Sequence, residues 1–135
     1  SKGEKIGGCM PPANLQQSDF LVSNPGAVAS NIVFKKSSFV DAGGYDPSLK
    51  SSADRAIFIE LFKRGYSCRL VEKYLIRRGV GHPDQWSDNG HLILPGKLLF
   101  ARRYWSMMKV KEKLGTVVKV SLTLVSIVRG WVRLG

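Results

Sequence analysis

The last forty residues of the chain are basic and amphipathic, and this feature limits the possible folds more than any other. Residues 96–135 carry nine Lys and Arg side chains against the single acid Glu112, a net charge of +8. Residues 1–95 carry twelve basic and nine acidic side chains, a net charge of only +3. The sequence therefore predicts two domains, a near-neutral body (1–95) and a basic tail (96–135). The charge of the tail favours an anionic partner.

Two helices are expected in the tail. In the first, over 97–113, apolar and basic side chains gather on different sides of a helical wheel. The second, over 116–134, has a narrow polar strip and an apolar arc wider than half its circumference. That helix would be about 28 Å long, but it contains three charges, each unfavourable by about 2.5–3.5 kcal/mol at mid-membrane. We therefore expect the tail to lie on an anionic membrane surface rather than to span the membrane.

The composition fits one globular unit of ordinary size. Of the 135 residues, 44% are apolar and 23% are charged, which excludes an intrinsically disordered chain. The two cysteines, Cys9 and Cys68, are too few for a disulfide framework and favour a reducing compartment. Residues 1–10 do not resemble a signal peptide. We expect a cytoplasmic protein that is peripheral at the cytoplasmic face of the cell membrane.

The body alternates between helix and strand signals. An apolar-polar alternation over 28–36 predicts a strand, and two further short strands are expected over 66–71 and 74–78. A brief helix should run from Ser37 or Ser38 to Ala42. A longer helix should begin after the N-cap Ser52 and end before Gly65. These elements together predict an α/β fold.

Asp54 is the first candidate for chemistry. It falls in the first turn of the expected helix, where backbone N–H groups should hold its carboxylate ionised. A fixed carboxylate can act as a general base on an attacking hydroxyl. The alternative is that Asp54 only stabilises the helix start, which is a common role for Asp in first turns.

Two glycine-containing loops supply the other candidates. His82 lies in a polar loop over 79–87, where it could bind a metal ion or a phosphate, or simply face solvent. Trp86 of the same loop could stack on a sugar ring or close the edge of the core. Gly43 and Gly44 follow a helix, where two glycines most often only permit positive φ.

In order and spacing, these segments resemble the family-2 glycosyltransferases, over the second half of their GT-A catalytic domain. The match covers residues 20–90. It consists of a small-residue strand with Phe-basic-basic-Ser (30–37), Gly-Gly-Tyr-Asp (43–46), an Asp opening a helix (53–54), a strand (68–71) and His-x-x-Gln-x-Ser (82–87). Ala53 departs from the family, which usually has an acid there. The resemblance implies the second half of a GT-A domain followed by amphipathic helices.

The resemblance also implies roles for individual residues. Asp54 would be the base of an inverting transfer of a sugar from a nucleotide-sugar donor to a sugar or lipid-linked acceptor, in cell-envelope or surface polysaccharide synthesis. A Mg²⁺ or Mn²⁺ ion would neutralise the leaving diphosphate, with His82 near it and most ligands in a first half that carries Asp-x-Asp. The acceptor and donor would contact the remaining candidates, Ser30, Asn31, Gly44, Tyr45, Asp46, Gln85 and Trp86.

Two other functions are compatible with the sequence. The basic tail, Ala53 and the missing donor half would also suit a non-catalytic membrane-binding module or a degenerate glycosyltransferase fragment. Nucleic-acid binding is disfavoured, because the basic residues accompany a wide apolar arc rather than exposed aromatic side chains for base stacking.

Overall fold

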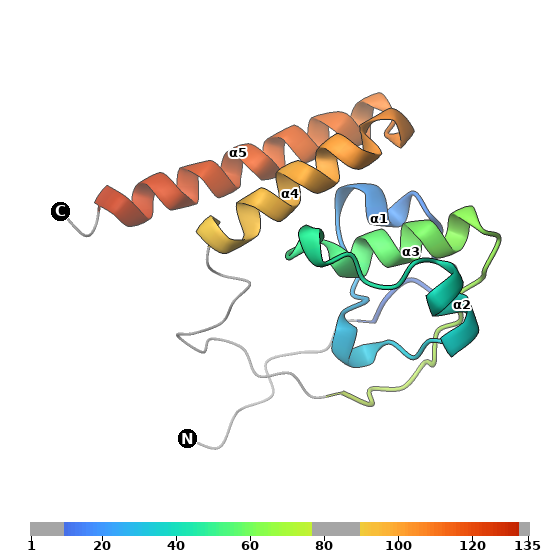
Figure 1. The fold of residues 1–135 in the computed structure, drawn as a ribbon. Helices are drawn as coiled ribbons and strands as arrows, with labels where there is room; N and C mark the ends of the chain where they lie inside the picture. The colour runs from blue at the N-terminus through green and yellow to red at the C-terminus, as the bar shows by residue number, and fades with distance from the viewer. Residues whose placement is uncertain (1–9, 77–89, 133–135) are drawn as a thin grey trace, which may run out of the picture.

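The computed structural model of the protein describes residues 10–76 and 90–132, and these residues form an all-helical structure (Figure 1). Its elements in order are α1 (Asp19–Val22), η1 (Ala29–Asn31), α2 (Lys36–Asp41), η2 (Pro47–Leu49), α3 (Ala53–Lys63), α4 (Gly90–Tyr104), η4 (Trp105–Met107) and α5 (Val110–Val132), where η denotes a 3₁₀ helix. No β-strand occurs over 10–76 or 90–132. The expected α/β fold, and with it the expected half of a GT-A domain, is therefore wrong.

The strand predicted over 28–36 is replaced by the 3₁₀ turn η1. The side chain of Asn31 closes this turn: its Oδ1 accepts the Val28 N–H at 2.8 Å, and its Nδ2 donates to the Gly26 carbonyl at 2.8 Å. Such local side-chain bonds compete with a sheet ladder for the backbone groups. Val28 and Ile32, on either side, keep extended backbone angles but have no partner strand.

The segment 66–76 also lacks the predicted strands over the part that the structure describes. Several of its apolar side chains, among them Val71, Leu75 and Ile76, are more than half exposed. A strand is stable only when its backbone pairs with another strand. Over 66–76 the residue types suit a strand, but no second strand pairs with this segment in the described part of the chain.

Helix α3 is the centre of the body. It begins after Ser52, as predicted, although the Ser52 side chain makes no capping hydrogen bond. It ends at Lys63, and Gly65 follows with a φ of +79°, so both predicted boundaries are confirmed. Its buried side chains surround most of the helix, as expected for an element covered on several sides: Ala56, Ile57, Phe58, Ile59 and Leu61.

The tail folds back on the body. Helices α4 and α5 pack against each other, α4 also contacts η2, and α5 contacts α1. Gly96 allows α4 to approach closely, because a Cβ at this position would lie 2.9 Å from the backbone nitrogen of Ser51. The two tail helices are confirmed, but the break between them is at η4, and the predicted break between 113 and 116 is wrong.

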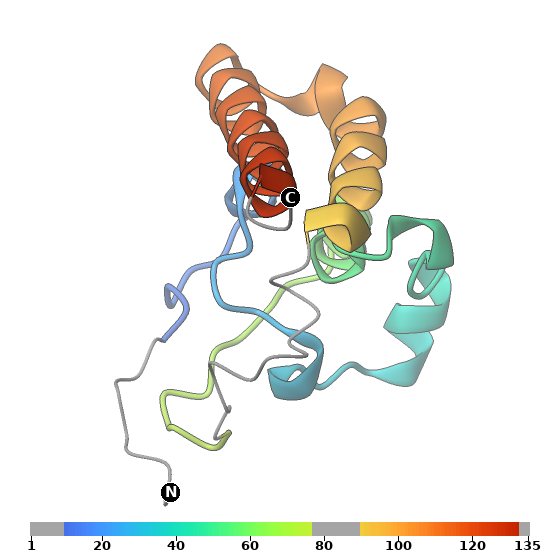
Figure 2. The ribbon, with the colours of Figure 1, turned by 90° about the vertical axis from the view of Figure 1, so that its left-hand side faces the viewer.

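Helices α4 and α5 together form a layer on one side of α1 and α3, while η1 and α2 lie on the other side (Figures 1 and 2). The core runs between these layers. Its largest fully buried side chains are Phe20, Leu49, Ile57, Ile59, Phe100 and Tyr104. Among the described helices, none is both long enough and apolar enough to span a membrane.

Candidate functional site

Asp54 lies at the second residue of α3, half-buried against the turn η1. Burial raises the pKa of its carboxyl group, and an interaction with the backbone N–H of Ala29 partly opposes this shift. The position of Asp54 in the first turn of a helix would by itself lower this pKa. A carboxyl whose pKa is moved toward neutral pH is a better general base than an ordinary surface aspartate, provided that it is ionised at the working pH.

Tyr45 is the second predicted residue that the structure places near Asp54. The turn before it needs the positive φ of Gly43 (+88°) and Gly44 (+67°), which is the role that two glycines after a helix most often have. The Tyr45 ring packs edge-on against Phe39, with ring centroids 5.3 Å apart. Burial, and then the nearby charge of Asp54, raise the pKa of the Tyr45 hydroxyl, so this group is a neutral hydrogen-bonding group.

Ser30 and Asn31 are exposed residues of η1, the turn that touches Asp54. They line one wall of a 570 Å³ cavity, together with Phe58 and Phe62 of α3 and side chains of the segment 66–76. The side-chain amide of Asn31 is already engaged in holding its own turn. Ser30 is therefore the better placed of the two for contact with a ligand. Asp54 and Tyr45 do not line this cavity.

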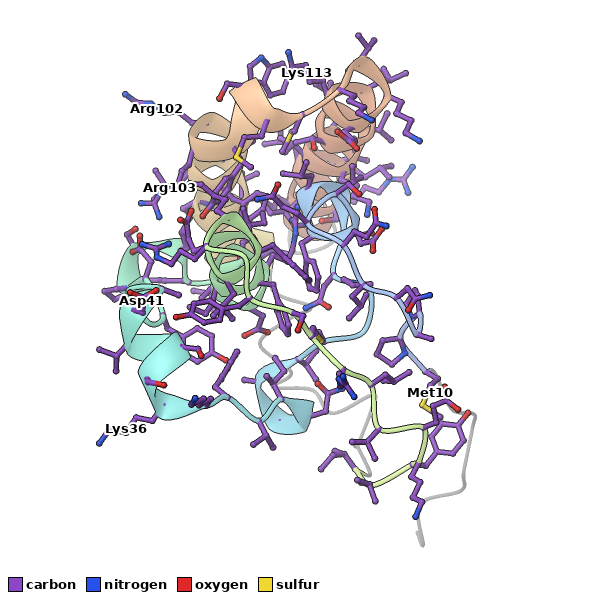
Figure 3. The ribbon with its side chains drawn as sticks, turned by 90° about the vertical axis from the view of Figure 1, so that its right-hand side faces the viewer. Met10, Lys36, Asp41, Arg102, Arg103 and Lys113 are labelled. Carbon is purple, nitrogen blue, oxygen red and sulfur yellow. The ribbon has the colours of Figure 1, made fainter. Side chains whose placement is uncertain are left out.

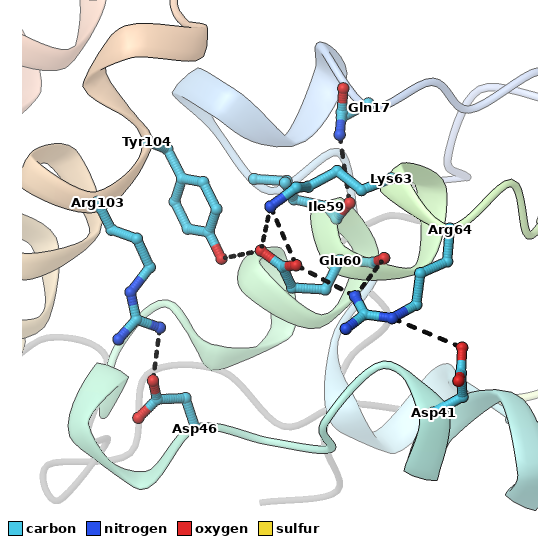
Figure 4. A network of polar contacts seen from close by, with 9 residues as sticks. All are labelled: Gln17, Asp41, Asp46, Ile59, Glu60, Lys63, Arg64, Arg103 and Tyr104. Atoms are coloured by element: carbon cyan, nitrogen blue, oxygen red, sulfur yellow. Dashed lines mark hydrogen bonds and ion pairs between the residues drawn. The ribbon is translucent and has the colours of Figure 1, made fainter.

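Asp46 was predicted to bind substrate, but its carboxylate has structural partners (Figure 4). It accepts the Ser48 N–H at 2.8 Å at the start of η2 and forms an ion pair with Arg103 of α4. Hydrogen bonds from Ser48 and from Arg103 lower the pKa of Asp46 to about 2. Asp46 thus joins η2 to the tail.

We expect Asp46→Asn to lower the midpoint of thermal unfolding at neutral pH. The folded pKa of Asp46 lies below its unfolded value, so the carboxylate stabilises the fold above the unfolded pKa, and this contribution is lost as the pH falls toward 2. The wild-type and variant midpoints, measured by circular dichroism, should therefore converge in acid. An equal difference at neutral and at acid pH would contradict a role for the charge.

The remaining predicted site residues, His82, Gln85 and Trp86, lie outside the described residues. Within 10–76 and 90–132, no three His, Cys, Asp or Glu side chains come together in a group that could hold a metal ion. No metal ligand is assigned among these described residues, and the predicted metal ligand His82 lies outside them.

Sequence reasoning missed a largely buried cation, Arg55, between the body and the tail. Arg55, the neighbour of Asp54, donates to the carbonyls of Phe20 and Leu21, and its guanidinium lies 3.8 Å from the centre of the Phe100 ring. Burial lowers the pKa of Arg55 to about 10. A single arginine within the apolar run of α3 was the one signal in the sequence.

Comparison of the chain with protein-family models, with curated proteins and with solved structures finds no significant match. Any conclusion about function therefore rests on the local geometry and on the order of residues in the sequence.

Proposed function

We propose that the chain carries the hydroxyl-acceptor side of an enzyme that transfers a sugar from a nucleotide-sugar donor, with inversion, and that Asp54 is its general base. The products would be glycans of the cell envelope or surface. This proposal depends on the residues around Asp54 and on their order in the sequence, not on the α/β fold, which the structure corrects.

The observation that carries the proposal is the convergence of three separate segments on one carboxylate. Asp54 comes from the start of α3, the Ala29 N–H comes from η1, and Tyr45 comes from the loop before η2. A helix-start aspartate with a purely structural role would need only its own helix. Here the carboxylate is partly desolvated and has a neutral phenol nearby.

The chemistry assigned to these residues is one proton transfer. The ionised Asp54 accepts the proton of the acceptor hydroxyl as its oxygen attacks the anomeric carbon from the face opposite the leaving group. The bond from the anomeric carbon to the diphosphate breaks, and the nucleoside diphosphate leaves with the bonding electron pair. The anomeric carbon passes through an oxocarbenium-like transition state and is inverted. Tyr45, whose hydroxyl is near the carboxylate, can orient a hydroxyl group of the acceptor.

The proposal predicts how the transfer rate depends on pH. Only the ionised carboxylate can accept a proton, so kcat/KM should rise with pH through the pKa of Asp54. Because burial raises this pKa, the rise should be centred above the ordinary value of 3.8. The measurement is transfer of labelled sugar by the complete protein, from a panel of nucleotide sugars, at a series of pH values.

A matched control is Asp41→Asn on α2, which removes an exposed carboxylate that pairs with Arg64 at 3.5 Å. This variant should keep the wild-type pH profile. A wild-type rate that is independent of pH across the acid range would contradict the assignment of Asp54, and the absence of transfer from every donor would contradict the proposed reaction.

A further inference from the structure

Helix α5 has its polar and apolar sides reversed relative to a normal surface helix. Its only buried residues over the part whose side chains are described, 110–129, are the polar Glu112, Thr116 and Thr123. Eight of its ten large apolar side chains over this range face outward and are between 44% and 83% exposed: Val110, Leu114, Val117, Val118, Leu122, Leu124, Val125 and Val128. The other two, Val120 and Ile127, are half-buried. A helix that only covers a protein core buries the apolar side instead.

Specific hydrogen bonds fix this orientation. Lys97 of α4 donates to the Thr123 hydroxyl at 2.7 Å, and Lys119 donates to the Val22 carbonyl at the end of α1 at 3.2 Å. Glu112 accepts the Lys109 N–H at 2.6 Å. Rotating α5 to bury its apolar side would break the bonds from Lys97 and Lys119, whereas the Glu112–Lys109 bond is local to the start of the helix. The outward apolar stripe is therefore a consequence of the packing.

The charges around the stripe have one sign. Lys111 and Arg129, both exposed, lie near its two ends, and Lys113 lies over the ring of the half-exposed Trp105, 5.4 Å from the ring centre. Glu112, the only acid of the tail, is buried. Lys113 and Arg102 both lie on the tail side of the molecule, away from Lys36 and Met10 (Figure 3).

We propose that this stripe, defined by the eight exposed apolar residues of α5 named above, lies flat in the interface of an anionic lipid bilayer. Its aliphatic side chains would enter the acyl region, and the flanking Lys and Arg side chains would reach the anionic head groups. The half-exposed Trp105 suits the level of the head groups. A second copy of the chain fits less well, because a symmetric contact would bring two basic surfaces together.

The proposal is independent of the sugar transfer, and vesicle binding tests it. The full chain is sedimented with vesicles of phosphatidylglycerol and phosphatidylcholine, and separately with pure phosphatidylcholine. We expect binding to the anionic vesicles, with Leu122→Glu lowering the affinity at least tenfold. Lys111→Gln should lower it about fivefold, which corresponds to about 1 kcal/mol per cation near such a surface.

The matched control is Val40→Glu, which introduces the same charge at a valine of α2 that is 65% exposed, compared with 62% for Leu122. It should bind vesicles like the wild type, and circular dichroism should show that both variants are folded. The proposal is overturned if the wild type does not bind anionic vesicles, or if Leu122→Glu binds as tightly. It is equally overturned if sedimentation velocity without lipid shows a dimer that Leu122→Glu dissociates, since a second copy would then cover the stripe.

Discussion

Replacing Asp54 with Asn should lower kcat for sugar transfer by about 10²- to 10⁴-fold, the range that a positioned general base contributes. Asn has nearly the same shape and can still accept a hydrogen bond from the Ala29 N–H, so the turn η1 should keep its place against α3. It cannot accept the proton of the acceptor. The KM for the nucleotide sugar should change little, because Asp54 is assigned to the acceptor.

The stability of the same variant separates a catalytic role from a structural one. Because burial raises the folded pKa of Asp54, its ionised form disfavours the folded state, and stability is lost as the pH rises through that pKa. Asp54→Asn should therefore be as stable as the wild type at neutral pH, or more so, in urea unfolding. A variant that loses both stability and activity would indicate that Asp54 only supports the start of α3.

The bounds of α3 and the end of α2 were predictable to within a residue because the signals for them are local, whereas α2 begins at Lys36, before the predicted start at Ser37 or Ser38. Gly65 after α3 acts within one turn of the chain through its positive φ, and Ser52 marks the start of α3 although its side chain makes no capping hydrogen bond. Gly43 and Gly44 likewise end α2 through their own φ angles. None of these residues needs a distant partner, so the sequence is sufficient at these positions.

The strands could not be predicted in the same way, because a strand requires a second strand. The alternation over 28–36 marks a segment that could pair with another strand. Because no strand within 10–76 or 90–132 pairs with it, the Asn31 side chain forms hydrogen bonds with the local backbone groups instead. The resemblance also assigned Asp46 to the substrate. In the structure its carboxylate pairs with Arg103, 57 residues away, and no local pattern reveals a contact at that separation.

The orientation of α5 likewise could not be predicted from the sequence. Its helical wheel shows a polar strip and an apolar arc, and the usual rule places the arc inside. The wheel cannot show that Lys97 and Val22 supply partners for Thr123 and Lys119. The sequence therefore predicted a membrane-facing tail from charge and hydropathy, but not the packing that turns the apolar side outward.

The junction between the tail and the body should depend most on Phe100, and Phe100→Ala should lower the free energy of unfolding by about 3–5 kcal/mol. The ring is 1% exposed, packs against Tyr104 with centroids 4.7 Å apart, and covers the guanidinium of Arg55. Its removal leaves a cavity and takes away the aromatic face over a largely buried cation. The measurement is urea unfolding followed by circular dichroism.

Leu98→Ala is the matched control, because Leu98 lies on the same helix two residues earlier and is 50% exposed. It should lower the free energy of unfolding by less than about 1 kcal/mol. If the two variants have equal effects, α4 is not held to the body through its Phe100 side. The same two variants also bear on α5, since α4 carries the Lys97 that binds Thr123: a chain that loses the α4 junction should lose the outward orientation of the apolar stripe with it.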